Sequence, residues 1–181
     1  MKFKYILLTF ATSAMLCKTA SAQLYKDPKA PVEQRVADLL KRMTLEEKIA
    51  QMSMSSLRGS MKGDVGIGVV ESPFITTNEV AAQSIAAKQY ARTKTRLGIP
   101  PIQIGECLHG QLAAGATVFP QTIGQGSTWN PALIEQMGKA IAYEASSSGV
   151  DQALSPLFDL IRDARYGRVE ECFSEDPYLT G

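Results

Sequence analysis

The order of apolar and polar positions along the chain predicts helices that alternate with short strands. From Pro31 to Met43, apolar residues recur every three or four positions with polar residues between them, which predicts an amphipathic helix. A second helix is expected from Thr44, because Thr44-Leu45-Glu46-Glu47 has the sequence of a capping box, in which a hydroxyl and a carboxylate bind each other's backbone N–H groups. Its apolar stripe continues through Ile49 and Met52.

The middle of the chain predicts one more helix between two strands. Val65 to Val70 is expected to form a short strand, although the region around it is rich in Gly and Ser. Asn78 is the expected N-cap of a helix that ends near Leu97-Gly98, since two prolines follow. Ile102 to Gly105 then has the character of a buried strand. The apolar positions of the helix include Val80, Ile85, Ala86 and Tyr90.

The clearest helix begins at Asn130-Pro131, an N-cap followed by proline at the first helical position, and ends before Gly149. A strand is expected from Gln152 to Ile161, interrupted or started by Pro156. Strands that alternate with long helices indicate a parallel α/β fold. The expected inner face of the helix is Leu133, Ile134, Met137, Ile141 and Ala145.

Residues 1–22 have the pattern of a cleaved signal peptide. Lys2 and Lys4 precede an apolar stretch from Tyr5 to Cys17, and Ala20-Ser21-Ala22 matches the small residues that signal peptidase accepts. A membrane anchor is the alternative, but about thirteen apolar residues at about 1.5 Å each are too short for a bilayer core of about 30 Å. The protein is therefore expected to be periplasmic or secreted, with residues 23–181 as its folded part.

Charge and cysteine content restrict the partners. Removal of residues 1–22 takes away three lysines and no acid, so the formal net charge changes from +1 to −2. This balance argues against nucleic acid or an anionic membrane as a partner. Cys107 and Cys172 remain, and they either form a disulfide or are two free, buried thiols. The second interpretation is slightly favoured.

Glu106 and His109 follow the strand predicted at 102–105. A Glu-x-x-His pair can ligate iron or manganese, but such a site needs a second pair on a facing helix, and His109 is the only histidine of the chain. No metal site is therefore expected, and His109 is interpreted as a structural residue of a turn. A carboxylate at the C-terminal end of a barrel strand lies at the mouth where such folds bind ligands, so Glu106 is a candidate for accepting sugar hydroxyls, with a structural ion pair as the alternative.

Three arginines lie between Arg162 and Arg168, at the end of the last predicted strand. Arginine–carboxylate pairs with the acids that follow would hold this loop, and only one arginine needs to reach a ligand. A nucleotide site is not indicated, because Gly124-Gln125-Gly126 alone is a weak signal. A serine or cysteine triad is also excluded if His109 is structural, which leaves carboxylate chemistry. The acids concerned are Glu170, Glu171, Glu175 and Asp176.

Five motifs in order resemble the N-terminal barrel domain of glycoside hydrolase family 3. They are Arg42-Met43-Thr44-Leu45-Glu46-Glu47-Lys48, Glu106-Cys107-Leu108-His109-Gly110, Phe119-Pro120, Thr128-Trp129-Asn130-Pro131, and Arg162-Asp163-Ala164-Arg165-Tyr166-Gly167-Arg168 with Glu175-Asp176-Pro177. The resemblance extends from about Leu24 to Gly181 and implies a (β/α)8 TIM-type barrel. A closed barrel takes about 250 residues, so at most about half of one is present. The segment alone would leave strand edges unpaired and is expected to need the remainder.

The resemblance assigns substrate-binding roles to Glu106 and Arg168, which would bind hydroxyls of the sugar in the cleavage subsite. It implies a retaining mechanism in which an aspartate attacks the anomeric carbon and a second carboxyl group protonates the leaving oxygen. In the family, the nucleophile follows a Lys-His motif, and both catalytic residues are expected beyond residue 181. Many β-glucosidases have Asp where this chain has Glu106, and Ala164 replaces a usual proline.

The activity implied is release of terminal non-reducing β-D-glucosyl residues from oligosaccharides, without a cofactor. A β-xylosidase or a β-N-acetylhexosaminidase of the same family is the alternative enzyme. A non-catalytic periplasmic sugar-binding protein is the alternative of a different class. The oligomeric state is left open.

Overall fold

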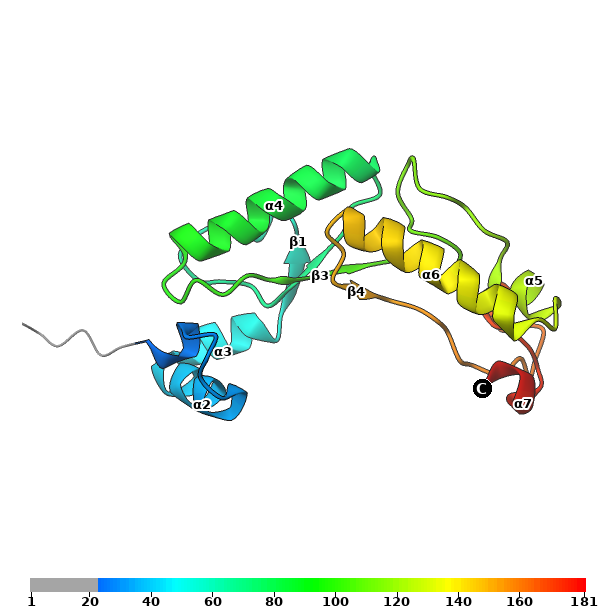
Figure 1. The fold of residues 1–181 in the computed structure, drawn as a ribbon, viewed down its shortest axis with the longest axis horizontal. Coiled ribbons are helices and arrows are strands. Elements are labelled where there is room, and N and C mark those ends of the chain that lie inside the picture. Colours follow the sequence, from blue (N-terminus) through cyan, green and yellow to red (C-terminus); the bar gives the residue numbers. More distant parts are fainter. Residues whose placement is uncertain (1–22) are drawn as a thin grey trace, which may run out of the picture. The chain divides into compact units, whose positions relative to one another are not determined.

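The computed structural model describes residues 23–181 (Figure 1), so the predicted signal peptide lies outside the described residues. The chain divides into two units, one ending at Met43 and the other beginning at Thr44. Each unit has its own internal contacts and is considered by itself.

The first unit contains a short 3-10 helix, η2 (Leu24–Lys26), and helix α2 (Val32–Arg42), which confirms the first predicted helix. Two hydrogen bonds join them: the backbone N–H of Tyr25 donates to Asp38 Oδ2 at 3.1 Å, and Arg35 Nε donates to the Tyr25 carbonyl at 3.0 Å. The apolar stripe of α2 remains exposed, since Val32 and Leu40 keep 64% and 49% of their accessible surface.

The second unit is built on four parallel strands in the order β1-β2-β3-β4. They are β1 (Met54–Ser56), β2 (Val69–Glu71), β3 (Ile102–Gly105) and β4 (Gln152–Ala153). The predicted α/β class is therefore confirmed. Strand order follows chain order without reversal, which is the arrangement that a β/α barrel requires. Within residues 23–181, β1 and β4 each pair with one strand only.

The strands test the sequence predictions unevenly. Strand β3 has the predicted bounds, β2 begins at Val69 and not at Val65, and β1 was not predicted. The strand predicted at 152–161 is wrong beyond Ala153. One further ladder contact, from Leu154 N to the Gly105 carbonyl at 2.9 Å, follows β4, and Pro156 has no N–H group with which to continue the pairing.

Helix α4 lies between β2 and β3, and α5 and α6 lie between β3 and β4, whereas the connection from β1 to β2 contains no helix. Helices α4 and α6 lie on one side of the strands (Figure 1). The capping box at Thr44 and the N-cap at Asn130 are both confirmed. The predicted N-cap Asn78 is wrong, because Thr76 and Glu79 form a capping box two residues earlier. The helices of this unit are α3 (Leu45–Gln51), α4 (Thr77–Lys94), α5 (Thr122–Gly126), α6 (Pro131–Ser147) and α7 (Pro177–Thr180), with the 3-10 helix η3 (Val169–Glu171) between α6 and α7.

Helix α4 packs on the sheet through small residues. Ile85, which the sequence placed on the apolar stripe, is 66% exposed, so that part of the prediction is wrong. Small side chains at spacings of four and three residues let the helix backbone come close to the sheet, where Ala87 joins Leu57 and Val70 in a buried cluster. The buried residues of α4 are Val80, Ser84, Ala87 and Ala91.

In helix α3, too, the buried residues differ from the apolar stripe that the sequence predicted. Its predicted apolar residues Ile49 and Met52 are 53% and 81% exposed, whereas Glu47 and Ala50 are buried. Glu47 is buried because its carboxylate accepts hydrogen bonds from Arg96 Nε at 2.8 Å and Nη2 at 2.5 Å. Glu47 therefore has two roles: it completes the capping box of α3, and its buried carboxylate forms an ion pair with Arg96.

Helix α6 packs through its C-terminal half. Ile141 and Ala145 form a buried cluster with Cys107 and Val150, while Leu133 at the other end is 47% exposed. Met137 packs against this cluster and Ile134 is partly buried, so the predicted inner face is confirmed except at Leu133. Both Cys107 and Cys172 are buried and free, as the favoured interpretation predicted.

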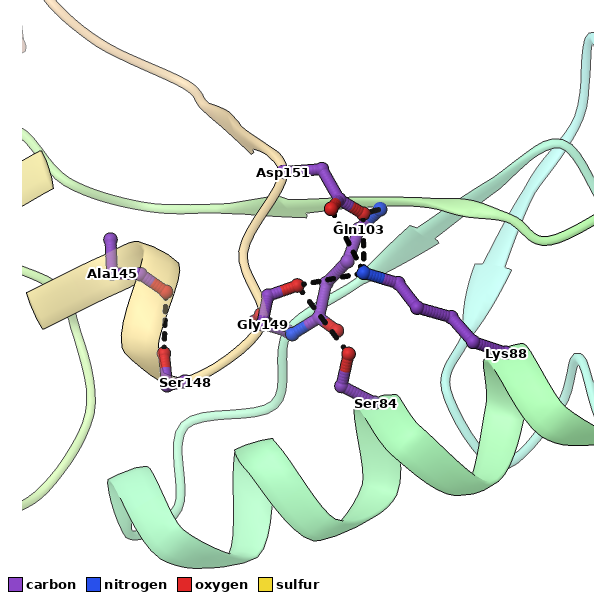
Figure 2. A network of polar contacts seen from close by, with 8 residues as sticks. Ser84, Lys88, Gln103, Ala145, Ser148, Gly149 and Asp151 are labelled. Carbon is purple, nitrogen blue, oxygen red and sulfur yellow. Dashed lines mark hydrogen bonds and ion pairs between the residues drawn. The ribbon is translucent and has the colours of Figure 1, made fainter. Parts of the chain in front are cut away.

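A polar network links α4 to the turn between α6 and β4 (Figure 2). Lys88 Nζ donates to the Gly149 carbonyl at 3.3 Å and pairs with the Asp151 carboxylate at 2.8 Å. Asp151 also contacts β3 twice: Gln103 N donates to Asp151 Oδ2 at 2.9 Å, and Asp151 N donates to the Gln103 carbonyl at 2.8 Å. Gly149 has a φ of +89°, and a Cβ there would lie 2.5 Å from Ser84 Oγ, so a glycine is required.

Among the helices of residues 23–181, none has both the length and the apolar character needed to cross a bilayer.

Candidate functional site

Glu106 follows β3 directly, at the carboxyl end of the parallel sheet. The backbone is fixed on both sides of it, because Leu154 N donates to the Gly105 carbonyl and Leu112 N donates to the Glu106 carbonyl, each at 2.9 Å. Its side chain is partly exposed. The ends of parallel strands are where α/β folds present ligand-binding groups, so the predicted position of Glu106 is confirmed.

The loop after Glu106 depends on Gly110. This glycine has a φ of +116°, and a Cβ on it would lie 2.1 Å from the Thr117 carbonyl oxygen. The neighbouring His109 carbonyl accepts a hydrogen bond from Phe119 N at 2.8 Å. The buried Gln125 side chain donates to the carbonyls of Leu108 and Pro120, at 3.3 and 2.8 Å. The His-Gly and Phe-Pro motifs are therefore parts of one folded loop.

Arg168 lies in the connection after β4, immediately before η3. Its Nε and Nη2 atoms donate to Glu171 Oε2 at 2.9 and 2.5 Å. Arg168 and Glu106 line the same pocket of about 230 Å³, so the fold brings the two predicted site residues together. The complete lining is Glu106, Leu108, His109, Gly110, Leu112, Arg168 and Glu171.

The stretch from Arg162 to Arg168 does not end a strand, contrary to the sequence prediction, but forms turns after the short β4. Arg165 pairs with Asp163 and is 91% exposed. Within residues 23–181, Glu171 is the only one of the four acids considered that forms an ion pair with an arginine. Asp176 instead caps α7 by accepting from Tyr178 N at 2.8 Å.

The electrostatics of the pocket keep its arginine charged. The hydrogen bond to Glu171 raises the pKa of Arg168 above its ordinary value, and the nearby Glu106 charge adds to the effect. Burial raises the pKa of the Cys107 thiol to about 11, with a smaller contribution from Glu106. Cys107 is therefore a neutral core thiol at neutral pH and has no nucleophilic character.

Cys172 has a structural contact with the site. Its Sγ donates to the Arg168 carbonyl at 3.3 Å, and burial raises the pKa of the thiol. The thiol thus helps to fix the backbone that carries the pocket arginine.

His109 lines the pocket in addition to its backbone contact with Phe119. Within residues 23–181, no three His, Cys, Asp or Glu side chains form a group that could hold a metal ion. The predictions did not include Glu171 as a site residue, although its position three residues after Arg168 was a signal, since such a spacing allows an arginine–carboxylate pair across one turn.

A larger hollow of about 610 Å³ lies near Trp129 and Phe158. None of the residues that line it is charged, whereas the pocket at Glu106 has two carboxylates and a guanidinium. The smaller pocket at Glu106 is the candidate site.

The chain is similar in sequence to known glycosidases. A β-xylosidase from Formosa agariphila is 35% identical over 165 residues, which cover 88% of this chain and 18% of the relative. A periplasmic β-glucosidase from Salmonella typhimurium is 36% identical over 151 residues, which cover 80% of this chain and 19% of the relative. The chain therefore spans about a fifth of the length of these relatives.

A solved structure has the same fold. The structure of a β-glucosidase from Erythrobacter marinus superposes with a TM-score of 0.77 at 33% identity, covering 88% of this chain and 23% of that one. The family profile described as glycosyl hydrolase family 3 N terminal domain matches residues 44–181. With that match over most of its length, the chain belongs to glycosyl hydrolase family 3 and carries part of the family's N-terminal α/β domain.

Proposed function

We propose that the full-length protein removes terminal non-reducing β-D-glucosyl residues from oligosaccharides, with Glu106 and Arg168 binding the sugar that is released. The observation that carries this proposal is that both residues line one pocket at the carboxyl end of β3. The names of the relatives, β-glucosidase and β-xylosidase, support the same reaction class.

The chemistry of the pocket suits a sugar ring. An ionised carboxylate accepts hydrogen bonds from neighbouring hydroxyls, and a guanidinium donates to hydroxyl oxygens, so Glu106 and Arg168 are complementary partners for a diol. The volume of about 230 Å³ is below the range of about 300 to 1,000 Å³ that is usual for larger ligands. A pocket of this size suits a small ligand such as a single sugar unit.

The proposed mechanism is retaining: a carboxylate attacks the anomeric carbon while a carboxylic acid protonates the leaving oxygen, and water then hydrolyses the glycosyl-enzyme. Glu106 and Arg168 would hold the ring in place for that attack, because positioning of the reacting carbon contributes strongly to rate. We infer that both catalytic carboxyl groups lie beyond residue 181, and Glu171 is assigned no catalytic role.

A β-xylosidase is the second candidate, favoured by the Formosa agariphila relative. The test is to express the full-length gene product and to measure hydrolysis of p-nitrophenyl β-glucoside and β-xyloside, with the anomer of the first product read by NMR. Cleavage with retention supports the proposal and the preferred substrate names the sugar. Cleavage of neither glycoside, or an inverted product, contradicts it.

We further propose that the protein acts in the periplasm or outside the cell. The signal-like pattern of residues 1–22 and the periplasmic relative support this location. Fractionation of the native host, with an antibody against the folded chain, tests it; retention in the cytoplasm would contradict it.

A further inference from the structure

The pocket contains a second carboxylate, that of Glu171, which accepts two hydrogen bonds from the Arg168 side chain. Glu171 Oε2 accepts from Nε at 2.9 Å and from Nη2 at 2.5 Å. The two contacts use a single oxygen, so Glu171 Oε1 and Arg168 Nη1 take no part in the ion pair. The guanidinium is therefore held along one edge while another part of it remains available to the pocket.

The orientation of an arginine matters because its side chain has many rotamers and its donors point in fixed directions within one plane. Two hydrogen bonds to one carboxylate select one orientation of that plane before a ligand arrives. The backbone of Arg168 is also fixed, by the thiol of Cys172 and by the backbone bond from Glu171 N to the Arg168 carbonyl at 3.1 Å. The remaining freedom lies in the side chain that Glu171 binds.

We propose that Glu171 is a positioning residue for hydrolysis, which orients the Arg168 guanidinium beside Glu106 so that it meets the sugar hydroxyls without rearrangement. The inference rests on the proposed function, because it assumes that Arg168 binds the sugar. In this proposal, Glu171 affects the rate of hydrolysis by fixing the orientation of Arg168 and does not itself contact the sugar.

If Glu171 only stabilised the fold, its replacement would lower stability together with activity. The Arg168 and Glu171 side chains keep 51% and 22% of their accessible surface. Ion pairs at partly exposed positions contribute little to the free energy of folding. Replacement by glutamine keeps the shape of the side chain and the backbone contact of residue 171 while it removes the charge. Loss of activity without loss of stability is therefore the signature of positioning.

The same loop provides a matched control. Arg165 and Asp163 form a similar pair between a guanidinium and a carboxylate, but neither residue lines the pocket. Asp163→Asn also keeps an acceptor for the Arg165 backbone N–H, which now donates to Asp163 Oδ1 at 2.9 Å. The two variants differ in whether the arginine concerned reaches the pocket.

The experiment compares Glu171→Gln and Asp163→Asn in the full-length protein, with kcat/KM on the better aryl glycoside and Tm as the two measurements. Glu171→Gln is expected to lower kcat/KM by about tenfold or more at unchanged Tm, since small misplacement of a binding group has large kinetic effects. Asp163→Asn is expected to stay within about twofold of wild type. In an Arg168→Ala background, Glu171→Gln should change kcat/KM by less than about twofold, because the guanidinium that Glu171 orients is absent.

Two results would overturn the inference. In the first, the wild-type protein cleaves the glycoside and the Glu171→Gln variant cleaves it equally well. This result overturns the positioning role of Glu171 and leaves the proposed function intact. The other is the same loss from Glu171→Gln with and without Arg168, which indicates a general folding effect. A wild-type protein that cleaves neither glycoside overturns the proposed function and this inference together.

Discussion

The two ends of the central sheet differ in how far their polar side chains are hydrogen-bonded within the protein. At the end where the chain enters β4, Lys88, Asp151 and the β3 backbone satisfy one another (Figure 2). At the carboxyl end of β3, no residue within 23–181 donates a hydrogen bond to the Glu106 carboxylate, and Arg168 keeps part of its guanidinium outside its ion pair. Mutually satisfied groups stabilise the fold, whereas unsatisfied groups at a strand end are available to a ligand.

This difference predicts that substitutions at the carboxyl end change activity and leave stability nearly unchanged. Glu106→Ala or Arg168→Ala in the full-length protein is expected to lower kcat/KM by about 10²-fold or more, because each removes a contact to the bound sugar. Steady-state kinetics on the aryl glycosides checks the loss, and thermal denaturation checks that Tm is preserved. Near-normal activity in both variants would refute the site.

At the other end, the largest effect on stability is expected from Gly149→Ala. The new Cβ would lie 2.5 Å from Ser84 Oγ at a φ of +89°, so strain and overlap should lower the free energy of unfolding by about 3 kcal/mol. Gly138 is the matched control, since it lies within α6 with open space around it. Gly138→Ala should raise stability by about 0.5 kcal/mol. Urea denaturation measures both, and equal effects would contradict the account.

The polar network itself is expected to contribute somewhat less. Asp151→Ala leaves Lys88 and the Gln103 N–H without their carboxylate partner and should cost about 2 kcal/mol of unfolding free energy at unchanged kcat. The comparison is Glu135→Ala, which breaks an exposed pair with Lys139 on α6 and should cost about 0.5 kcal/mol or less. If both variants unfold at the same urea concentration, the network has no special role.

The smallest effect is a dependence on pH from the pair between Glu47 and Arg96. The hydrogen bond from Arg96 lowers the pKa of Glu47 below its unfolded value. Stability from this pair is therefore present above the unfolded pKa of about 4.3 and is lost as the pH falls through the lower folded pKa. Glu47→Gln should reduce the loss of unfolding free energy on the acid side by about 1 kcal/mol, and Tm should therefore fall less steeply with decreasing pH. Parallel Tm curves for the two proteins would exclude the linkage.

Local signals in the chain predicted much of the fold. The capping box at Thr44, the N-cap at Asn130 and the β3 strand all appear at the predicted residues, because each depends on hydrogen bonds or side-chain patterns within a few positions. The N-cap of α4 was misplaced by two residues, since Thr76 and Asn78 are both capping residues and only the Glu79 carboxylate selects between them.

Packing was predicted less well than the elements themselves. Ile85 and Ile49 have apolar side chains but are exposed, while Ser84 and Glu47 are buried. The reason is that burial depends on the neighbouring element: α4 approaches the sheet through small residues, and Glu47 is buried by Arg96, which lies far from it in the chain. Such partners cannot be read from the period of a helix.

For the candidate site, the sequence by itself determined at which strand end Glu106 would lie, because the position after a strand is a local property. The sugar-binding roles of Glu106 and Arg168 were implied by the resemblance of the motifs to glycoside hydrolase family 3. Only the tertiary structure decided that Arg168 shares a pocket with Glu106 and that Glu171 holds its guanidinium. Those facts depend on two connections, after β3 and after β4, whose strands are neighbours in the sheet. Strand pairing over a long sequence separation brings them together.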